Sequence, residues 1–243
     1  MIPARQRCGQ ADARPLRRQV AGLPAVTAVS CGLSTSVALC APSSSSSAAA
    51  ATVWEWGGKC GHSPISVPLP HGAAPALVAA GARHRACACL DGRLFIWGSG
   101  RAVQGLQTLP QCVDGVRVGS MPHALACTWR GTGFIAADGR VNVLGPNDFL
   151  QHGTDAASAS SRGIVTFAKG DSCLKLLAGS EHFCAVLSRA DGSAHIVTWG
   201  WGEHGQLGNG AVADSPPCSI MQVAAAECAH VATGAAFVVL CPQ

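Results

Sequence analysis

Residues 57–62 hold the side chains that nucleophilic chemistry would need at short spacing. Cys60 and His62 lie two positions apart, and a thiolate activated by an imidazole requires such proximity. The glycine-rich run at 57–61 looks superficially like a phosphate-binding loop, but it is shorter than that motif. We therefore favour a loop that holds both side chains without a catalytic role over a reactive pair.

Other catalytic signatures are absent from the 243 residues. The sequence has no G-x-S-x-G nucleophile elbow, no H-E-x-x-H zinc helix and no G-x-x-x-x-G-K-S/T phosphate loop. Its thirteen cysteines include one C-x-C pair, Cys87 and Cys89, but no C-x-x-C pair that would suggest a zinc framework. We expect no catalytic residue, cofactor or metal site. Most cysteines are expected to be buried free thiols, which favours a reducing, intracellular compartment.

A second group of residues is typical of protein binding. Trp201 is flanked by Glu203 and His204, a combination that suits a binding hot spot when the aromatic ring is exposed. The alternative is that Trp201 packs within its own repeat and the charges are solvated. Trp129 and Arg130 could stack for binding or for structure alone. The predicted partner-binding residues are Glu181, Trp201, Glu203, His204, Trp129 and Arg130.

The composition favours short strands and gives little support for a nucleic-acid or membrane partner. Twenty-nine glycines and fourteen prolines imply many turns, as in an all-β chain. The net charge is +4, but residues 1–18 hold five of the 17 basic residues and one of the 13 acids, which leaves 12 of each. We therefore expect no direct nucleic-acid binding. The longest apolar stretch, 223–241, contains Glu227 and His230, so no membrane span is expected.

The chain repeats itself about every fifty residues. A small-residue turn followed by an apolar strand recurs with glycine at Gly32, Gly81, Gly179 and Gly234, and Thr128 takes the glycine position of one further unit. The steps between these anchors are 49, 47, 51 and 55 residues. Such self-similarity is typical of architectures in which every unit is one small supersecondary structure.

Further anchors follow in the first four units. A second strand closes with Trp56, Trp97 or Trp199 before a glycine, such as Gly200, and Leu144 holds the equivalent position in the third unit. Three units carry Asp-Gly between the two strands, a strong hairpin signal that predicts positive φ at both central turn residues. Each tryptophan is predicted to be a wedge packed against the adjacent unit, and the glycines let the backbone turn sharply.

These units predict a β-propeller. Strands of four to seven residues, with one small sheet per period, favour a propeller over a β-sandwich with chance similarity. We expect an all-β chain of about five recognisable four-stranded blades, with a basic segment over residues 1–24 and the propeller over residues 25–243. His84 and His182 both lie three residues after the repeat glycine, which predicts a repeated structural hydrogen bond across the turn.

The repeat unit resembles that of the regulator of chromosome condensation family. The residues that carry it are 127–145, 179–187 and 190–210, and the similarity extends over about residues 25–243. The resemblance implies a β-propeller that usually has seven blades, so this chain would form a shortened ring. Closure of that ring is expected from the N- and C-terminal segments, with residues 8–10 beside the last strands.

A narrower resemblance comes from G-S-E-H at 179–182, W-G-W-G-E-H-G at 199–205 and the final strand near 234–240. These stretches are similar to propellers of the yeast alpha-tubulin-suppressor type. The resemblance implies a non-enzymatic protein of the cytoplasm and nucleus that binds a small zinc-ribbon protein. It also implies support for wobble-uridine modification of tRNA through Elongator and for diphthamide synthesis. No homo-oligomer is expected.

Other functions remain open at this point. A guanine nucleotide exchange factor for a Ran-like GTPase is one alternative, favoured by the arginine-rich residues 1–18. A propeller scaffold with another partner is a second. The same arginine-rich start resembles an organelle transit peptide, but a disordered tail or a misread gene start is the favoured explanation.

Overall fold

The computed structural model describes residues 20–42, 50–70, 72–100, 105–154, 160–224 and 231–240. Within these ranges the chain forms β-strands and one 3-10 turn, η1 (Gly58–Cys60). The strands are β1 (Val26–Cys31), β2 (Thr35–Cys40), β3 (Thr52–Gly57), β4 (Ile65–Ser66), β5 (Pro75–Ala80), β6 (His84–Cys89), β7 (Leu94–Gly100), β8 (Gly105–Cys112), β9 (Leu125–Cys127), β10 (Thr132–Ile135), β11 (Val141–Leu144), β12 (Arg162–Val165), β13 (Ser172–Ala178), β14 (His182–Ser188), β15 (Ser193–Gly200), β16 (Ser215–Ala224), β17 (Val231–Thr233) and β18 (Val238–Leu240).

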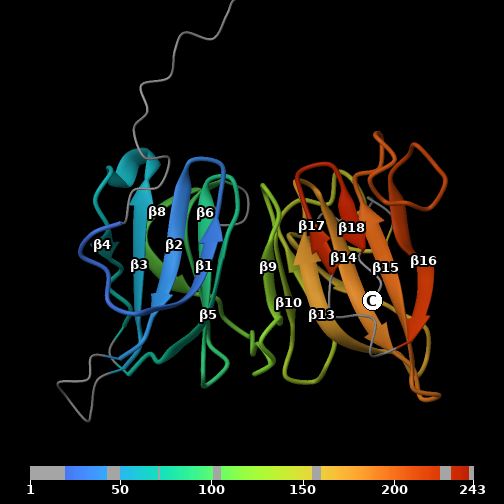
Figure 1. Ribbon diagram of the computed structural model, residues 1–243, viewed down its shortest axis with the longest axis horizontal. Coiled ribbons are helices and arrows are strands. Elements are labelled where there is room, and N and C mark those ends of the chain that lie inside the picture. The colour runs from blue at the N-terminus through green and yellow to red at the C-terminus, as the bar shows by residue number, and fades with distance from the viewer. Residues whose placement is uncertain are drawn as a thin grey trace, which may run out of the picture.

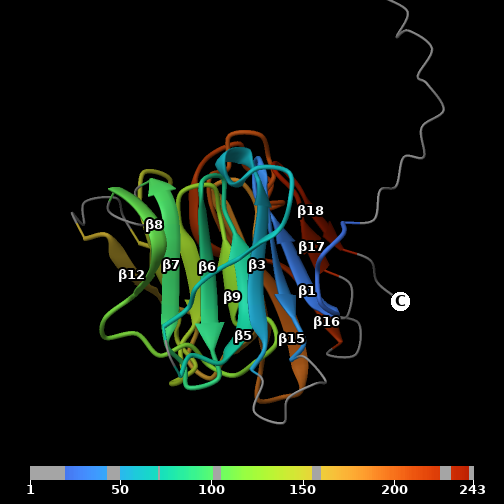
Figure 2. The same ribbon diagram turned by 90° about the vertical axis from the view of Figure 1, so that its left-hand side faces the viewer.

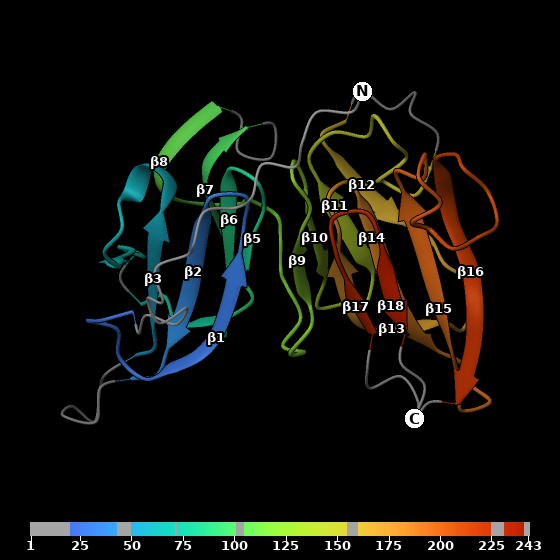
Figure 3. The ribbon, with the colours of Figure 1, turned by 45° about the horizontal axis from the view of Figure 1, so that its top comes forward.

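The described strands form five antiparallel sheets around a common axis (Figures 1 and 2). Four sheets hold four strands each in sequence order, β1–β4, β5–β8, β9–β12 and β13–β16, and the fifth is β17–β18. We name them blades 1 to 5. The first strand of each blade contacts the first strand of the next, from β1 to β17 (Figure 3). The predicted all-β propeller of about five blades is confirmed, while the predicted closing residues 8–10 lie outside the described ranges.

One tight turn joins the first two strands of every blade. The amide at its first position donates to the carbonyl three residues on: Gly32 to Thr35 at 2.7 Å, and Gly81 to His84, Thr128 to Gly131, Gly179 to His182 and Gly234 to Phe237 at 2.9 Å each. A Cβ on Gly81 or Gly179 would clash with the following imidazole and with a carbonyl of the next turn. The repeat therefore needs glycine where the fourth residue carries a ring.

The third turn reverses this arrangement. Thr128 stands at the glycine position, and Gly131 stands where blades 2 and 4 place histidine, blade 5 phenylalanine and blade 1 threonine. The Thr128 hydroxyl accepts a hydrogen bond from the Gly131 amide at 2.9 Å. The third turn thus carries its side chain at the first position and glycine at the fourth, and it keeps the backbone hydrogen bond of the other turns.

The two repeat histidines are buried, but their hydrogen bonds differ from the prediction. His84 Nε2 lies 3.0 Å from the Thr132 hydroxyl of the next blade, not from a group across its own turn. Neither ring nitrogen of His182 has a partner among the described residues, because Val238 stands where blade 3 has Thr132. Burial lowers the pKa of both histidines to about 4.

The Asp-Gly hairpins form where the sequence places them, but only their glycines have positive φ. Gly92, Gly139 and Gly192 have φ of 82°, 84° and 80°. Among the described residues that are not glycine, only Leu150 has positive φ, so none of the three aspartates does. The prediction of two such residues per turn was therefore wrong. The Asp91 carboxylate instead accepts from the Arg93 amide at 3.0 Å, which suits a type I turn followed by a left-handed glycine.

The wedge positions share one register on the third strands. Trp56, Trp97, Leu144 and Trp199 lie opposite Ser36, Arg85, Thr132 and Phe183, the equivalent residues of their second strands. Trp97 and Trp199 are fully buried, and each indole N–H donates to the preceding blade, to Glu55 Oε2 at 3.0 Å and to the Gln151 carbonyl at 2.9 Å. The wedge prediction is confirmed for these two, whereas Trp56 of blade 1 is half-buried.

The apolar core lies between consecutive blades. One buried cluster joins blades 1 and 2, a larger one joins blades 2 to 4, and a third joins blade 4 to blade 5. The described cysteines are free. Cys87 is buried in the cluster between blades 1 and 2, and Cys184 in the cluster between blades 4 and 5. Burial raises the pKa of Cys184 to about 12, so it behaves as a small apolar side chain. No helix among the described residues is long and apolar enough to span a membrane.

Candidate protein-binding face

The five inner turns meet at one mouth of a central channel. Backbone amides link them blade to blade: Ala82 N donates to the Trp129 carbonyl at 3.2 Å, Trp129 N to Ser180 at 2.6 Å, and Ser180 N to Ala235 at 3.1 Å. First strands and turns of all five blades line a cavity of about 620 Å³. Trp129 lies on its rim and is 48% exposed. These backbone bonds join the turns of blades 2 to 5, whereas blade 1 is joined to blade 2 by the Ala80 amide, which donates to the Ser30 hydroxyl at 3.0 Å.

An ion-pair network crosses from blade 3 to blade 4 next to that mouth. Arg130 Nε donates to Glu181 Oε1 at 2.6 Å, and Arg130 Nη1 donates to Asp148 Oδ2 at 2.8 Å. The amide of Gln151 donates to the other oxygen, Glu181 Oε2, at 3.0 Å. Glu181 is buried, so this predicted binding residue acts on a partner only through Arg130, which remains partly exposed.

A row of aromatic rings continues the network outward. The Arg130 guanidinium lies 5.2 Å from the Phe149 ring centroid, and Phe149 lies 6.2 Å from Trp201. Trp201 in turn contacts His204 edge-on at 4.8 Å and donates its indole N–H to Glu203 at 3.1 Å. We name Arg130, Phe149, Trp201, Glu203 and His204 the aromatic strip. Five of the six predicted binding residues thus lie together, and Arg130 stacks on Phe149, not on Trp129.

Two loops of the same shape present this strip. In residues 147–153 the Phe149 amide donates to the Gln151 side chain, and in residues 202–208 the His204 amide donates to the Gln206 side chain, both at 2.9 Å. Leu150 and Gly205 hold the same left-handed backbone position, with φ of 63° and 72°. Phe149 and His204 are therefore equivalent residues of neighbouring blades, and they stand on either side of Trp201.

Sequence reasoning missed Asp148, Phe149 and Gln151. Residues 147–153 lack most of the glycines of residues 202–208, so the two loops look unrelated in the sequence. A usable signal was present, since both loops share Gln-x-Gly, at Gln151 and at Gln206. The shared glutamine is what caps the loop from within, so it is the residue that defines the turn.

The Cys60 segment is built into a different junction, between blades 1 and 2. Glu55 Oε2 lies 2.9 Å from Arg85 Nε, and the Cys60 thiol donates to Glu55 Oε1 at 3.3 Å. Burial and the neighbouring carboxylate raise the pKa of Cys60, which opposes a thiolate nucleophile. His62 is exposed, and no hydrogen bond joins it to Cys60. In the described ranges no group of three or more His, Cys, Asp and Glu side chains could hold a metal ion.

The last complete repeat matches a known family model. Residues 195–241 match the Regulator of chromosome condensation (RCC1) repeat. This segment is therefore similar to an RCC1 repeat. Trp201, Glu203 and His204 of the aromatic strip therefore lie in the matched segment, on the loop that follows β15. Arg130 and Phe149 lie outside it, in blade 3.

Three curated relatives extend the similarity along the chain. Human RCC1 domain-containing protein 1 is 30% identical over 173 residues, covering 66% of this chain and 43% of the relative. The Arabidopsis thaliana ultraviolet-B receptor UVR8 is 28% identical over 230 residues, covering 85% and 49%. The Bos taurus secretion-regulating guanine nucleotide exchange factor is 30% identical over 162 residues, covering 56% and 33%. The chain thus spans less than half the length of these relatives.

The fold has counterparts among solved structures. Human WBSCR16 superposes with a TM-score of 0.73 at 21% identity, over 93% of this chain and 60% of that one. At this identity the likeness concerns the fold alone. The chain therefore shares its fold with 60% of a longer chain.

Proposed function

We propose that this protein is a non-enzymatic, protein-binding propeller whose aromatic strip docks a partner protein. The observation that carries the proposal is the partly exposed Arg130 guanidinium, which the buried Glu181 carboxylate of the next blade holds in place. Three rings, Phe149, Trp201 and His204, continue from it in contact with one another. Aromatic and arginine side chains on a rigid support supply most of the energy in protein interfaces. The strip offers both, includes the acidic Glu203, and has Asp148 paired with Arg130 beside it.

The partner that we propose is a small zinc-ribbon protein. Support comes from the resemblance of residues 179–182 and 199–205 to propellers of the alpha-tubulin-suppressor type. These two stretches contribute Glu181, Trp201, Glu203 and His204, so the resembling residues are the ones that form the strip or hold it. The proposal includes a role in tRNA wobble-uridine modification through Elongator and in diphthamide synthesis, in the cytoplasm and nucleus.

Co-purification from the native organism tests the partner, and a titration with the purified zinc-ribbon protein tests the surface. Trp201→Ala is expected to weaken binding at least about tenfold, because a central aromatic anchor is lost. Trp54→Ala is the matched control, since Trp54 is also half-buried but lies in blade 1. Equal affinity of the two variants, or absence of any zinc-ribbon protein from the purified material, would contradict the proposal.

A second candidate function is guanine nucleotide exchange on a small GTPase. It is favoured by the similarity to the bovine exchange factor and by the five arginines in residues 1–18. The assay is the release of labelled nucleotide from a Ran-like GTPase with and without the protein. A release rate that the protein leaves unchanged removes this candidate.

A further inference from the structure

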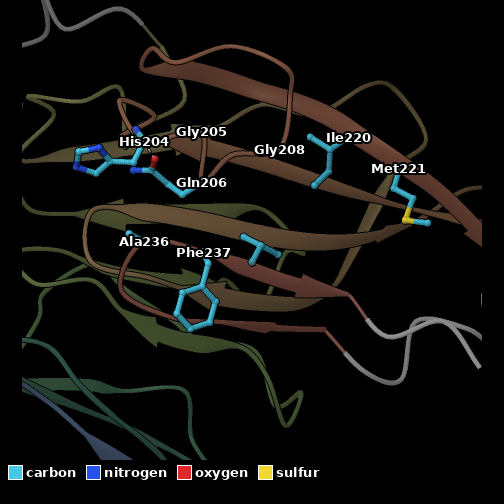
Figure 4. Close-up of a pocket in the computed structure, with 9 residues that line it drawn as sticks. His204, Gly205, Gln206, Gly208, Ile220, Met221, Ala236 and Phe237 are labelled. Atoms are coloured by element: carbon cyan, nitrogen blue, oxygen red, sulfur yellow. Dashed lines mark hydrogen bonds between the residues drawn. The ribbon is translucent and has the colours of Figure 1, made fainter.

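Two pockets of similar volume differ in the side chains that line them. The pocket beside Gln206, of about 320 Å³, is lined by apolar side chains such as Ile220 and Phe237, and the described residues around it include no Asp, Glu, Lys or Arg (Figure 4). A pocket of about 290 Å³ on blade 3 has three arginines and one acid among the described residues of its lining, Arg117, Arg140, Arg162 and Asp138. We name it the arginine pocket, because it gathers positive charge that the first pocket lacks.

The pleat of blade 3 places two of these arginines on one face of the sheet. Phe134 lies opposite Asn142, and Asn142 lies opposite Ile164, so the three form a row across β10, β11 and β12. Residues two positions apart on a strand face the same side, so Arg140 lies on the side of Asn142 and Arg162 on the side of Ile164. The row and both arginines therefore line the same pocket.

The third arginine is brought in by the connection between blades 2 and 3. The Arg117 carbonyl accepts from the Ala137 amide at 2.9 Å, and Val118 forms a bridge with Ala136 beside the hairpin of blade 3. The Arg117 side chain donates from Nη1 to the neighbouring Val116 carbonyl at 3.1 Å. Main-chain bonds thus hold the connection against the hairpin, and the three arginines come from three separate segments.

Only one of the three arginines has a carboxylate partner. Arg140 donates to Asp138 from Nε at 2.8 Å and from Nη2 at 2.6 Å. Arg162 donates to two uncharged acceptors, from Nη2 to Asn142 Oδ1 at 3.3 Å and from Nη1 to the Gly115 carbonyl at 3.5 Å. The other two arginines form no ion pair among the described residues. A guanidinium carries more N–H donors than these bonds use, so donors remain for an anion.

Charge complementarity favours a doubly charged anion. Three positive charges and one negative charge give the lining a net charge of +2. A phosphate monoester carries about 1.5 to 2 negative charges at neutral pH and has three strong acceptor oxygens. A carboxylate has less charge and fewer oxygens, so it would leave more of the guanidinium donors unused. Guanidinium groups also bind phosphoryl oxygens in pairs, which suits arginines that approach from separate segments.

The rest of the pocket is apolar. The row across the sheet runs from the fully buried Phe134 to Ile164, which is 46% exposed although it lies among charged side chains. A volume of roughly 300 Å³ is at the lower limit for sites that bind small organic molecules, so the pocket has room for more than a phosphoryl group. An exposed isoleucine beside the arginines therefore suits a ligand whose phosphate is attached to an apolar ring.

We propose that the arginine pocket binds an aryl phosphate, with Arg117 and Arg162 donating to the phosphoryl oxygens and Ile164 in contact with the ring. Two sources share this chemistry, a phosphotyrosine side chain of another protein and a free aryl phosphate. The inference goes beyond the proposed function, because the pocket lies beside the hairpin 136–140, whereas Arg130 of the aromatic strip lies in the turn at the other end of β10.

Isothermal titration calorimetry of the full chain with phenyl phosphate tests the site. Saturable binding is expected, about tenfold tighter than that of inorganic phosphate, because the ring buries apolar area against Ile164. Benzoate is expected to bind at least about tenfold more weakly than phenyl phosphate, because it has fewer oxygens and less charge. N-acetyl-phosphotyrosine amide separates the two sources: tighter binding than phenyl phosphate assigns the site to a protein side chain, and equal or lower affinity assigns it to a free aryl phosphate.

Arg162→Ala is expected to weaken the binding of phenyl phosphate about tenfold, because charge-assisted hydrogen bonds are lost. Arg162→Lys keeps the charge but not the planar fork, so its affinity should lie between those of the parent and the alanine variant. Arg83→Ala is the matched control, because Arg83 is also exposed and forms no ion pair among the described residues, but lies in the first turn of blade 2. The control should bind like the parent.

No saturable binding of phenyl phosphate, or an equal loss of affinity in the Arg83→Ala and Arg162→Ala variants, would overturn the proposal. Inorganic phosphate that binds as tightly as phenyl phosphate would overturn the apolar ring, and benzoate that does so would overturn the phosphate. Trp201→Ala is expected to leave the binding of phenyl phosphate unchanged. Failure of the arginine pocket and failure of the aromatic strip are therefore seen in separate measurements.

Discussion

The junction between blades 1 and 2 and the junction between blades 3 and 4 are built from the same residue types in opposite order. In the first, the acid belongs to the leading blade, as Glu55, and the arginine to the following blade, as Arg85. In the second, Arg130 leads and Glu181 follows. A buried tryptophan indole donates across both junctions to the leading blade.

Exposure separates the two junctions. The side chains of Glu55 and Arg85 are 10% and 9% exposed, whereas that of Arg130 is 34% exposed and that of its second partner, Asp148, is 45% exposed. The first pair is sealed between blades and stabilises their packing. In the second junction the Glu181 carboxylate is buried, whereas the Arg130 guanidinium is partly exposed and lies against the Phe149 ring. The same chemistry therefore acts as internal packing in one place and as a supported surface in the other.

The largest effect is expected from Glu55→Ala. Its loss leaves a buried guanidinium without its carboxylate and the Trp97 indole without its acceptor, at a cost of about 3–5 kcal/mol in the free energy of unfolding. Urea unfolding followed by tryptophan fluorescence measures it. Glu55→Gln, which keeps an acceptor for the indole, should lose less. A cost below about 1 kcal/mol for Glu55→Ala would break the comparison.

The dependence of stability on pH tests the burial of His84 and His182. Burial holds the pKa of His84 and His182 at about 4, against an ordinary value of 6.5. Between these values the unfolded chain takes up protons and the folded chain does not. The free energy of unfolding therefore falls as pH falls from 6.5 towards 4, by up to about 1.4 kcal/mol per pH unit for each histidine. His84→Gln should flatten this dependence, and a slope equal to that of the parent protein would refute the assignment.

A smaller effect is expected from Glu181→Ala. This change leaves the amide of Gln151 without its acceptor, but Arg130 keeps Asp148 and access to water. We expect a cost of about 1–3 kcal/mol, below that of Glu55→Ala measured in the same urea experiment. A cost equal to or above that of Glu55→Ala would show that the second junction is as sealed as the first.

The smallest effect belongs to Asp148→Asn. The pair with Arg130 is exposed to solvent, so its loss is expected to cost at most about 1 kcal/mol. Raising the salt concentration from about 0.1 M to 1 M should remove the difference between this variant and the parent, because salt screens exposed charges. A salt-independent difference would indicate that the pair is buried in solution.

The repeat could be predicted from the sequence because it is local. Each repeat glycine marks a point where two backbone segments come close together, at positions 32, 81, 179 and 234. The tryptophans at 97 and 199 mark the space that one large side chain fills in each blade. Those positions give the blade register and the fold. Four of the six predicted binding residues also lie together on the aromatic strip, with Glu181 buried beneath Arg130, although their role in binding stays a prediction.

What escaped prediction depends on contacts across blades. His84 finds Thr132 forty-eight residues away, and Arg130 finds Glu181 fifty-one residues away. The burial of Glu181 could not be predicted, because its partners Arg130 and Gln151 belong to another unit. The loop at 147–153 was also obscured, since a leucine takes the left-handed position that glycine holds in the next blade.

The exchanged pair in the third turn shows which contacts exclude a side chain from the first position of such a turn. A methyl group added at Gly81 would overlap both the His84 imidazole and the Thr128 carbonyl. Removing the ring leaves that carbonyl in place, and a Cβ on Gly32 would overlap the Gly81 carbonyl although no ring follows it. Gly81→Ala is therefore expected to destabilise the fold even in a chain that also carries His84→Gly, whereas Thr128→Gly, which puts glycine at both ends of the third turn, should fold.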